Sequence, residues 1–506
     1  LKKSSDGSTL HELCIKNKSM EALGVLDLAA PLTGNKALST SVRALELRTS
    51  SKRSRLKVPG TDITLVGVNA NSKLYKSFLQ LLPKQEKFVD HDFQSILGSI
   101  CEDENVCRFK DQILWKRAEE IFAPNEVELF GNVSPNDVNQ GDLGDCYFLT
   151  ALASTAEYPE RLRSIFLNES ANAYGLYGVR LYLQGIPTEI ILDDSFPCSV
   201  KTGQPIFTRL KPETSPLWVF LAEKAWAKVN KTYETIVGGA RSEAFENLLG
   251  CPAISYDNEE FTHEALGKFL LENDRKRYLM TAGRYANSAD LKGLIPGHAY
   301  SILEVVNSKV LRTVMIKIRN PWGHTEWTGD YSDESPKVTP ELAEELSLVK
   351  ENDGIFWMTL QDFKMFFDGF TVAFYEEGWK YNYLRLKNSE KTSIKFSVNE
   401  TTKISFRLHQ RDRRSYSPSE RMNHRYAEVE DFSIYRKGTF GILTLLTRDK
   451  EDDCPNDTRS VYYTRRNVKI FERGEYVIKI RINSFMKGES FVVSSYSDKD
   501  VKMIEL

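Results

Sequence analysis

The chain has 506 residues, 41% of them hydrophobic and 27% charged, and its 68 Lys and Arg nearly balance its 70 Asp and Glu. This is the composition of an ordinary globular protein of two or three domains. No apolar run reaches the ~20 residues that a membrane-spanning helix needs, and no His and Cys cluster has the spacing of a zinc site. The seven cysteines are scattered and odd in number, which argues against a disulfide framework and for a reducing compartment.

The first 85 residues are weakly patterned. Residues 9–26 predict an amphipathic helix, and the basic stretch 43–60 predicts a solvated loop rather than an interaction arm. The opening LKKSSDGSTL lacks the apolar segment of a secretory signal, although the chain does not begin with Met and an upstream signal stays open. Propeptide, anchor and adaptor all remain open as the role of this region.

Helical and extended segments alternate from about residue 87 to residue 377. Residues 217–230, LWVFLAEKAWAKVN, carry apolar side chains at helical spacing and predict a buried helix. SILEVV and VLRTVMIKI predict two strands joined by a turn at residues 307–309. The mixture of helices and hairpin-connected strands indicates an α+β fold for this part of the chain.

Short alternating strands follow one another after residue 380, with no convincing helix among them, and predict an antiparallel β-sandwich over residues 379–506. From residue 380 on, 26 Lys and Arg stand against 18 Asp and Glu, so this part carries a net charge of +8 and the remainder −10. A basic sandwich can bind an acidic partner or an anionic phospholipid surface, or it can dock on the acidic part of the same chain. The charge pattern leaves both open.

The stretch QGDLGDCYFL, residues 140–149, holds a candidate nucleophile. Cys146 begins a predicted helix after a loop rich in Gly and Asp, and the positive end of that helix would favour a thiolate. The amide of Gln140 and the backbone N–H of Cys146 could donate hydrogen bonds to an oxyanion. The alternative is that Cys146 is a buried small residue at the start of a core helix, which is the commoner case for a lone cysteine.

His298 and Asn320 are candidate partners of this cysteine. His298 opens the first predicted strand, in GHAYS, and Asn320 closes the second, in RNPWG. A turn at residues 307–309 places residue 298 opposite residue 318, so that Asn320 lies one diagonal step from His298. An amide that accepts a hydrogen bond from the imidazole is the third group that orients a Cys–His pair. A satisfied structural histidine is the alternative for His298.

In this order, QGDLGDC, GHAYS and RNPWG resemble the three catalytic blocks of the calpain family of papain-like cysteine proteases. The flanking segments FVDHDF, LWKRAEEI, LDDSFP and DGIFWM are similar as well, so the resemblance covers about residues 87–378 almost continuously. The segments ERGEYVIKIRI and FVVSSYS resemble, more weakly, the end of the β-sandwich that follows the protease core in many calpains.

The resemblance implies a papain-like core of two subdomains over residues 86–378, divided near residues 235–240, and a C2-like β-sandwich after it. It also implies an endopeptidase in which Cys146 is the nucleophile, His298 the general base and acid, and Asn320 the residue that orients the imidazole, with Gln140 as oxyanion donor. The residues that it places in the substrate cleft are Trp322, which would shield the His–Asn bond, Gly239 and Gly297.

The resemblance implies calcium as a cofactor, with one site in each half of the core. In the second half the carboxylates of Glu326, Asp333 and Asp353 match, Glu351 falls where a backbone carbonyl is used, and Ile355 replaces an acid. In the first half Asp137 matches, but Pro216 stands where a glutamate is expected. Because calcium affinity follows the number of carboxylates, we expect one retained site and one weak or absent site.

Three functions compete for this sequence. The first is a cytoplasmic endopeptidase, regulated by calcium, that makes limited cuts in protein substrates. The second is a catalytically inactive scaffold whose sandwich binds protein or phospholipid; loss of Cys, His or Asn usually marks such proteins, and all three are present here. The third, acyl transfer such as transglutamination, lacks support from the flanking blocks. The absence of a penta-EF-hand pattern predicts a non-conventional calpain that is a monomer, and we expect no nucleic-acid partner.

Overall fold

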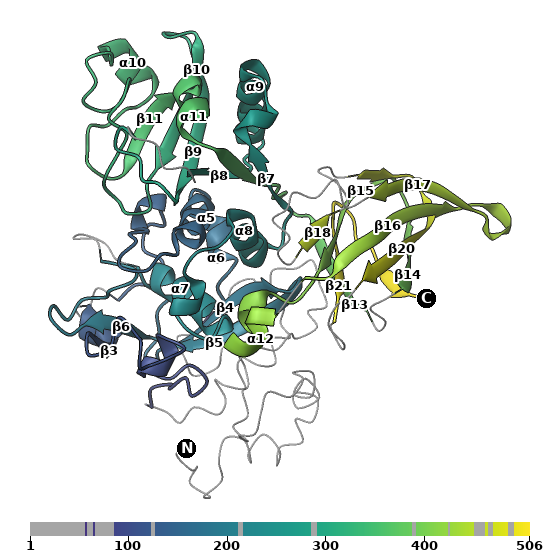
Figure 1. Ribbon diagram of the computed structural model, residues 1–506, viewed down its shortest axis with the longest axis horizontal. Helices are drawn as coiled ribbons and strands as arrows, with labels where there is room; N and C mark the ends of the chain where they lie inside the picture. The colour runs from purple at the N-terminus through teal and green to yellow at the C-terminus, as the bar shows by residue number, and fades with distance from the viewer. Residues whose placement is uncertain are drawn as a thin grey trace, which may run out of the picture. The chain divides into compact units, whose positions relative to one another are not determined.

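The computed structural model describes residues 56–57, 64–65, 86–122, 127–210, 216–284, 291–386, 391–423, 426–449, 461–463, 469–483 and 490–506 (Figure 1). The predicted helix over residues 9–26, and all of the predicted loop 43–60 except Leu56 and Lys57, lie outside this range. The chain forms two compact units: Leu1–Leu143, Tyr158–Leu181 and Pro187–Val237 make the first, and Gly144–Glu157, Tyr182–Ile186 and Gly238–Leu506 make the second. Within the described ranges, no helix has the length and apolar character needed to cross a membrane.

Short elements surround one long buried helix in the first unit. Its strands pair two by two: β1 (Leu56–Lys57) with β2 (Thr64–Leu65), β3 (Ile113–Arg117) with β6 (Ser195–Ser199), and β4 (Leu176–Leu183) with β5 (Ile186–Asp193). The tip of the β4–β5 hairpin belongs to the second unit. The helices of the first unit are η2 (Leu97–Ser99), α4 (Ala118–Ile121), η3 (Pro135–Asp137), α6 (Pro159–Arg163), α7 (Leu217–Val229) and η4 (Glu234–Ile236).

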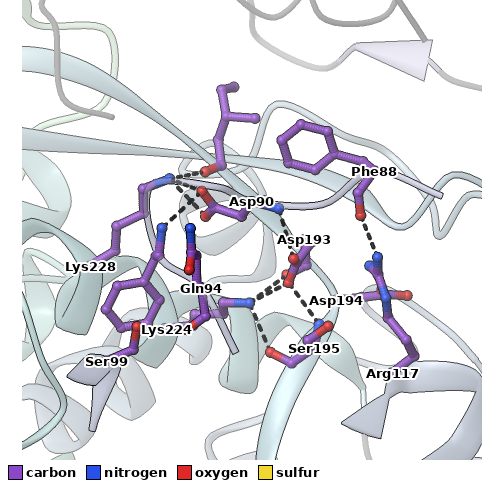
Figure 2. A network of polar contacts seen from close by, with 12 residues as sticks. Phe88, Asp90, Gln94, Ser99, Arg117, Asp193, Asp194, Ser195, Lys224 and Lys228 are labelled. Atoms are coloured by element: carbon purple, nitrogen blue, oxygen red, sulfur yellow. Dashed lines mark hydrogen bonds and ion pairs between the residues drawn. The ribbon is translucent and has the colours of Figure 1, made fainter. Parts of the chain in front are cut away.

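Helix α7 confirms the buried helix predicted over residues 217–230, and even its two lysines are buried. A buried charge is stable only when it is paired, and both lysines have a carboxylate partner: Lys224 Nζ lies 2.5 Å from Asp193 Oδ1, and Lys228 Nζ lies 2.7 Å from Asp90 Oδ2. Figure 2 shows these two pairs side by side, joined by a hydrogen bond of 2.9 Å from the backbone N–H of Asp90 to Asp193 Oδ2. The network ties the segment around Asp90 to α7 and to the end of β5.

Cys101 and Cys107 form a disulfide that closes a short loop of the first unit. Cys146, Cys198 and Cys251 are free thiols. One short-range bridge is not a disulfide framework, but it removes part of the basis on which the cysteine count predicted a reducing compartment.

A six-stranded antiparallel sheet forms the centre of the second unit, in the order β11-β10-β9-β8-β12-β7. Its strands are β7 (Ala253–Asp257), β8 (Leu279–Arg284), β9 (His298–Ser308), β10 (Thr313–Arg319), β11 (Ile355–Thr359) and β12 (Gly369–Ala373). The helices that accompany it are α5 (Cys146–Ala156), α8 (Arg241–Leu249), η5 (Asn258–Glu260), α9 (His263–Arg275), α10 (Pro340–Glu345) and α11 (Leu360–Phe366). Helix α5 packs on β8, β9 and α8, so the residue that begins α5 is held by the sheet.

The β9–β10 hairpin forms, but its predicted register is wrong. Strand β9 continues through residues 307 and 308, and Ser308 pairs with Thr313, so the connection is residues 309–312 rather than 307–309. A bulge between Lys317 and Ile318 then shifts the register by one residue, and Ile318 faces Ile302 instead of residue 298. The sequence pattern marked the polar residues of the turn, whereas β9 extends past them because its edge pairs with β10.

The strands after residue 380 form two antiparallel sheets that share one apolar core. One sheet has the order β13-β21-β15-β18 with β19 also on β15, and the other has the order β17-β16-β20-β14-β22. A short helix, α12 (Pro418–Asn423), and two turns of 3₁₀ helix, η6 (Arg413–Ser415) and η7 (Thr439–Gly441), interrupt the strands. The strands are β13 (Lys380–Arg385), β14 (Lys391–Val398), β15 (Thr402–His409), β16 (Glu428–Lys437), β17 (Leu443–Asp449), β18 (Val461–Tyr463), β19 (Lys469–Phe471), β20 (Gly474–Asn483), β21 (Val492–Ser497) and β22 (Met503–Glu505).

Candidate active site

Cys146 is the first residue of α5, as the sequence predicts. The preceding Asp145 has a non-helical backbone (φ −104°, ψ 27°), so the helix begins at the cysteine. Every residue of α5 after Cys146 is buried, whereas Cys146 itself is partly accessible. The helix therefore presents one reactive side chain, at its positive end.

Burial nevertheless raises the pKa of the Cys146 thiol above its usual range. The nearby Asp145 raises this pKa further, while the backbone N–H of Ala299 and the charge of Arg241 act in the opposite direction. The expectation that the helix end would favour a thiolate is thus not met, because loss of solvation disfavours the charged form more than these donors favour it. At neutral pH the resting group is a thiol.

His298 opens β9 and lies 2.9 Å, through its Nε2, from Asn320 Oδ1. An amide oxygen only accepts hydrogen bonds, so Nε2 carries the hydrogen and Nδ1 keeps a lone pair that can accept a proton. Burial lowers the pKa of His298 to about 4, although the bond to Asn320 favours the protonated form. The imidazole is therefore a neutral base with a fixed tautomer.

Asn320 is fully buried, and hydrogen bonds hold both its backbone and its side-chain amide. Its backbone N–H donates to the carbonyl of Gly354 over 2.8 Å, and its Nδ2 donates to the carbonyl of Thr325 over 2.8 Å. Its Oδ1 also accepts the backbone N–H of Trp322 over 3.1 Å. Because Nδ2 faces a carbonyl, Oδ1 must face His298, and the orientation of the amide is determined.

The indole of Trp322 packs on the imidazole, with ring centroids 4.9 Å apart and planes tilted by 49°. The edge of Tyr300 packs on another side of the same ring at 5.0 Å. These two aromatic side chains contribute to the burial that lowers the pKa of His298. The predicted contact between Trp322 and the histidine is present.

Cys146 and His298 belong to elements that are hydrogen-bonded to each other. Ser301 Oγ of β9 donates to the carbonyl of Thr150 in α5 over 3.0 Å, and Thr150 Oγ1 donates to the carbonyl of Cys146 over 2.8 Å. Ala299, whose backbone N–H acts on the Cys146 thiol, is the residue after His298. The structure thus places Cys146 beside the residue that follows His298, and His298 in contact with Asn320. Sequence reasoning did not find Ser301 and Thr150, because small polar residues inside a strand and a helix carry no signal of pairing.

Two predicted cleft glycines differ in their surroundings. A Cβ at Gly239 would lie 2.4 Å from the ring of Tyr147 and 2.8 Å from Nη2 of Arg414, so this position has room only for hydrogen. A Cβ at Gly297 would meet no atom within 4 Å, and Gly297 has φ +64°, which favours glycine. Gly239 thus packs against the residue that follows Cys146, and Gly297 supplies the turn that leads to His298.

Gln140 lies in the first unit, and its side chain is buried. Its Nε2 donates to the carbonyl of Leu143 over 2.6 Å, whereas its Oε1 is buried without a hydrogen-bond partner. The neighbouring Gly141 donates its backbone N–H to the carbonyl of Phe207, and Arg209 donates its own to the carbonyl of Asn139. Hydrogen bonds within the first unit therefore hold residues 139–141, which precede Cys146. Gln140 keeps one Nε2 hydrogen that can be donated to another acceptor.

Three of the predicted calcium carboxylates influence one another electrostatically. Asp333 and Asp353 both raise the pKa of Glu326, in addition to its burial. Burial and the charge of Asp353 raise the pKa of Asp333 to about 6, and its Oδ2 is buried without a hydrogen-bond partner. The backbone N–H of Glu351 bonds to Asp333, and that of Gly354 to Glu326 Oε1 over 2.8 Å. A buried carboxylate oxygen without a hydrogen-bond partner, next to acids that repel it, has the chemistry of a cation ligand. Among the described residues, however, no group of three His, Cys, Asp or Glu is close enough together to hold a metal ion.

Asp137 has different partners. One of its oxygens accepts the backbone N–H of Ser134 over 3.0 Å and Nε1 of Trp218 over 3.3 Å. Pro216, at the position where the resemblance expects a glutamate, is the N-cap residue of α7. Among the described residues of the first unit, Asp137 and Pro216 thus do not fit a calcium site, because the matching acid caps a helix turn and its expected partner is apolar.

Comparisons with known proteins identify the family to which the chain belongs. The family model of the calpain family cysteine proteases matches residues 88–373. The calpain-type cysteine protease DEK1 of Arabidopsis thaliana is 33% identical over 306 residues, which are 57% of this chain and 14% of that protein. The human calpain-2 catalytic subunit is 36% identical over 265 residues, 50% of this chain and 37% of that protein. The chain therefore spans well under half the length of these relatives. A clostridial cysteine protease structure, Cwp84, covers 74% of this chain and is itself covered to 97%, with 11% identity and a TM-score of 0.22, which is too low to support an argument on the fold.

Proposed function

The chain belongs to the calpain family of cysteine proteases, and from this premise we propose that it is an endopeptidase that cuts proteins through Cys146, His298 and Asn320. One observation carries the proposal: the 2.9 Å contact of His298 Nε2 with Asn320 Oδ1 leaves Nδ1 as a base in the unit that holds Cys146. The inactive scaffold is the weaker alternative, because a vestigial site has no need of an amide fixed from three sides.

The mechanism follows from the protonation states. Both groups are neutral at rest, so Nδ1 of His298 takes the thiol proton as the sulfur of Cys146 attacks the peptide carbonyl carbon. The imidazolium then gives this proton to the leaving amine, the C–N bond breaks, and a thioester remains on Cys146. A water molecule that loses its proton to His298 attacks the thioester carbon. The C–S bond then breaks, the acid leaves, and the imidazolium returns the proton to the sulfur of Cys146. Asn320 keeps Nε2 protonated throughout, which directs every transfer through Nδ1.

We propose that the backbone N–H of Cys146 and the side-chain amide of Gln140 stabilise the oxyanion of the tetrahedral intermediate. The position of Cys146 at the start of α5 supports this role, since its N–H has no acceptor within the helix. The remaining amide hydrogen of Gln140 supports it as well. The role of Gln140 is an expectation from the resemblance, and Gln140→Ala with retained folding is the variant that tests it.

The triad is tested by the rate of casein cleavage by purified variants. Cys146→Ala should abolish cleavage, and His298→Ala should reduce it by about 10²–10⁴-fold, the usual contribution of a general acid–base group. Asn320→Ala should cost less, since it only orients the imidazole. Cys198→Ala, at a buried thiol of the first unit, is the control that should retain the rate. Cleavage that survives Cys146→Ala would refute the proposal.

Calcium regulation is proposed for the second unit alone. Glu326, Asp333 and Asp353 would hold the ion, which would neutralise their mutual repulsion and order the loop that bonds to Asn320 through Gly354. Titration calorimetry of the protein with calcium should show one site, and Asp333→Asn should weaken it. Two tight sites would contradict this proposal.

We also propose that the C-terminal sheets form a C2-like sandwich that binds anionic phospholipid. The net charge of +8 supports this partner, as do two exposed apolar side chains, Phe440 and Ile442, at the β16–β17 connection. In a sedimentation assay, vesicles that contain phosphatidylserine should carry the protein into the pellet, and vesicles of phosphatidylcholine alone should not. Equal sedimentation with both would refute a charge-based interaction. The monomeric state and the cytoplasmic location stay predictions.

A further inference from the structure

An arginine of the sandwich reaches the nucleophile helix. Arg414 lies in η6, the turn that follows β15, and its guanidinium donates two hydrogen bonds to Glu243 of α8: Nη1 to Oε1 over 3.0 Å and Nη2 to Oε2 over 2.7 Å. Both side chains are buried, with 13% and 4% of their surface exposed. This is the planar two-point geometry that arginine alone provides.

The same guanidinium packs on the residue next to the nucleophile. The Cζ atom of Arg414 lies 5.5 Å from the ring centroid of Tyr147, which follows Cys146 and is buried. Gly239 completes the packing, since a Cβ there would overlap both the Tyr147 ring and Arg414 Nη2. The first turn of α5 is therefore enclosed by Gly239 and by a side chain that comes from another part of the chain, more than 260 residues away in sequence.

The turn that carries Arg414 is itself held by hydrogen bonds. Asp412 Oδ1 accepts the backbone N–H of Arg414 over 2.7 Å, and its carbonyl accepts Ser415 Oγ over 2.7 Å. Arg411 donates from Nε to Ser415 Oγ over 2.8 Å and from Nη2 to the Ser415 carbonyl over 2.9 Å. A side chain on such a turn can hold its partners in position, whereas one on a loose loop could not.

A second arginine of the sandwich holds the other end of α8. Arg407 of β15 is fully buried and donates from Nη1 to the carbonyl of Cys251 over 2.8 Å, and from Nη2 to the carbonyl of Gly250. These carbonyls follow the C-terminus of α8, where a cation is favourable. Arg414 and Arg407 thus form hydrogen bonds near the two ends of α8, and α8 packs on α5.

We propose that Arg414 is a positioning residue for Cys146, so that the sandwich is part of the catalytic apparatus rather than an appended binding module. A buried ion pair by itself contributes little to stability, because desolvation offsets the attraction. What Arg414 adds is a fixed place for Tyr147 and Glu243, and through them for the thiol that the first turn of α5 carries. The proposal rests on the proposed function for its consequence, the loss of proteolysis.

The test compares four variants, Arg414→Ala, Arg414→Lys, Glu243→Gln and the control Arg413→Ala, by two readouts. The first is the rate of casein cleavage. The second is the rate of carboxamidomethylation of each free cysteine by iodoacetamide at pH 8, measured by mass spectrometry of tryptic peptides. Arg413 is the neighbour of Arg414, but it is exposed and contacts the carbonyl of Arg421 instead, so Arg413→Ala should match the wild type in both readouts.

In Arg414→Ala, we expect the rate of casein cleavage to fall at least tenfold and the rate of Cys146 alkylation to rise at least threefold. The reason is that the Arg414 guanidinium no longer packs on the first turn of α5. Alkylation of the buried Cys198 should not change, which distinguishes a local effect from unfolding. Glu243→Gln should move both readouts in the same direction by less, and Arg414→Lys should restore them only in part, since lysine cannot bond both oxygens at once.

Unchanged cleavage and unchanged Cys146 alkylation in Arg414→Ala would overturn the proposal. So would a parallel rise at Cys146 and Cys198 in Arg414→Lys and Glu243→Gln, since this would assign the pair a purely structural role. If Arg414→Ala does not fold, these two milder variants decide. If the wild type cleaves no casein, the proposed function fails, yet selective alkylation of Cys146 still decides whether Arg414 positions the thiol.

Discussion

Cys146 and His298 are both uncharged in the resting site, and this follows from one cause. Burial disfavours the thiolate and the imidazolium alike, so that it raises the pKa of the acid and lowers that of the base, to about 4 for His298. The thiolate form of Cys146 and the imidazolium form of His298 are therefore both disfavoured near neutral pH. Both shifts favour the uncharged pair at neutral pH, so we expect proton transfer to accompany attack.

This protonation state predicts the pH dependence of Cys146 alkylation. Between pH 5 and 9 the rate with iodoacetamide should rise by about tenfold per unit, as the thiolate fraction does. His298→Gln should leave this slope unchanged, because the neutral histidine does not supply the charge. A plateau of reactivity between pH 4 and 8 in the wild type, removed by His298→Gln, would instead show a thiolate–imidazolium pair and contradict the account.

At the residue level the sequence predicted the helix start at Cys146 and the contact of His298 with Asn320, but not the environment of Cys146. The helix start at Cys146 follows from the Gly and Asp residues before an apolar run, and His298 and Asn320 follow from the ends of two strands. The direction of the Cys146 pKa did not follow, because desolvation depends on what α5 packs against, which local sequence does not encode.

For the secondary-structure elements, too, the sequence predicted some features and missed others. The sequence predicted the hairpin that joins His298 to Asn320, yet the bulge at Lys317 and Ile318 decides its register. A bulge depends on pairing with both neighbouring strands and leaves no mark in hydrophobic alternation. The predicted contact between His298 and Asn320 is present despite the error in register, because side chains reach diagonally across a ladder.

Two adjacent glycines before α8 allow a prediction at this scale. Gly239→Ala forces the Tyr147 ring from its place, and we expect a loss of about 1–3 kcal/mol in the free energy of unfolding, as for overpacking, together with reduced casein cleavage. Gly238→Ala has free space but φ +69°, so it should cost about 1–2 kcal/mol through the backbone alone and retain cleavage. Urea unfolding and the casein assay measure both. Equal effects of the two variants on cleavage would show that Tyr147 is not held from this side.

For the whole molecule, the buried ion pairs of the first unit are the feature that composition cannot reveal. The four charges of Asp90, Asp193, Lys224 and Lys228 sit in a sequence that reads as ordinary amphipathic segments. The two ion pairs join residues 31 and 138 positions apart, and the hydrogen bond between Asp90 and Asp193 spans 103 positions. Only the assembled fold specifies these contacts. Strand and helix patterns thus predicted the mixture of helices and sheets, while the contacts that fix each unit were not predictable.

Removal of one partner should therefore be costly. Lys228→Met leaves Asp90 buried without its cation, and we expect a loss of about 3–5 kcal/mol in the free energy of unfolding. The double variant Asp90→Asn/Lys228→Met should recover part of it, since no unpaired charge remains. Lys87→Met, which breaks the exposed pair with Glu119, should change stability by less than about 1 kcal/mol. Similar losses for Lys228→Met and Lys87→Met in urea unfolding would contradict the role of the buried network.

The central claim, that Cys146 is the nucleophile of a working peptidase, is tested most directly by labelling with an E-64-type epoxide, with and without calcium, followed by peptide mapping. We predict a single adduct on Cys146, no adduct on Cys198 or Cys251, and loss of casein cleavage in proportion to the label. Absence of an adduct on Cys146 in both conditions, or full cleavage by a completely labelled protein, would contradict the claim.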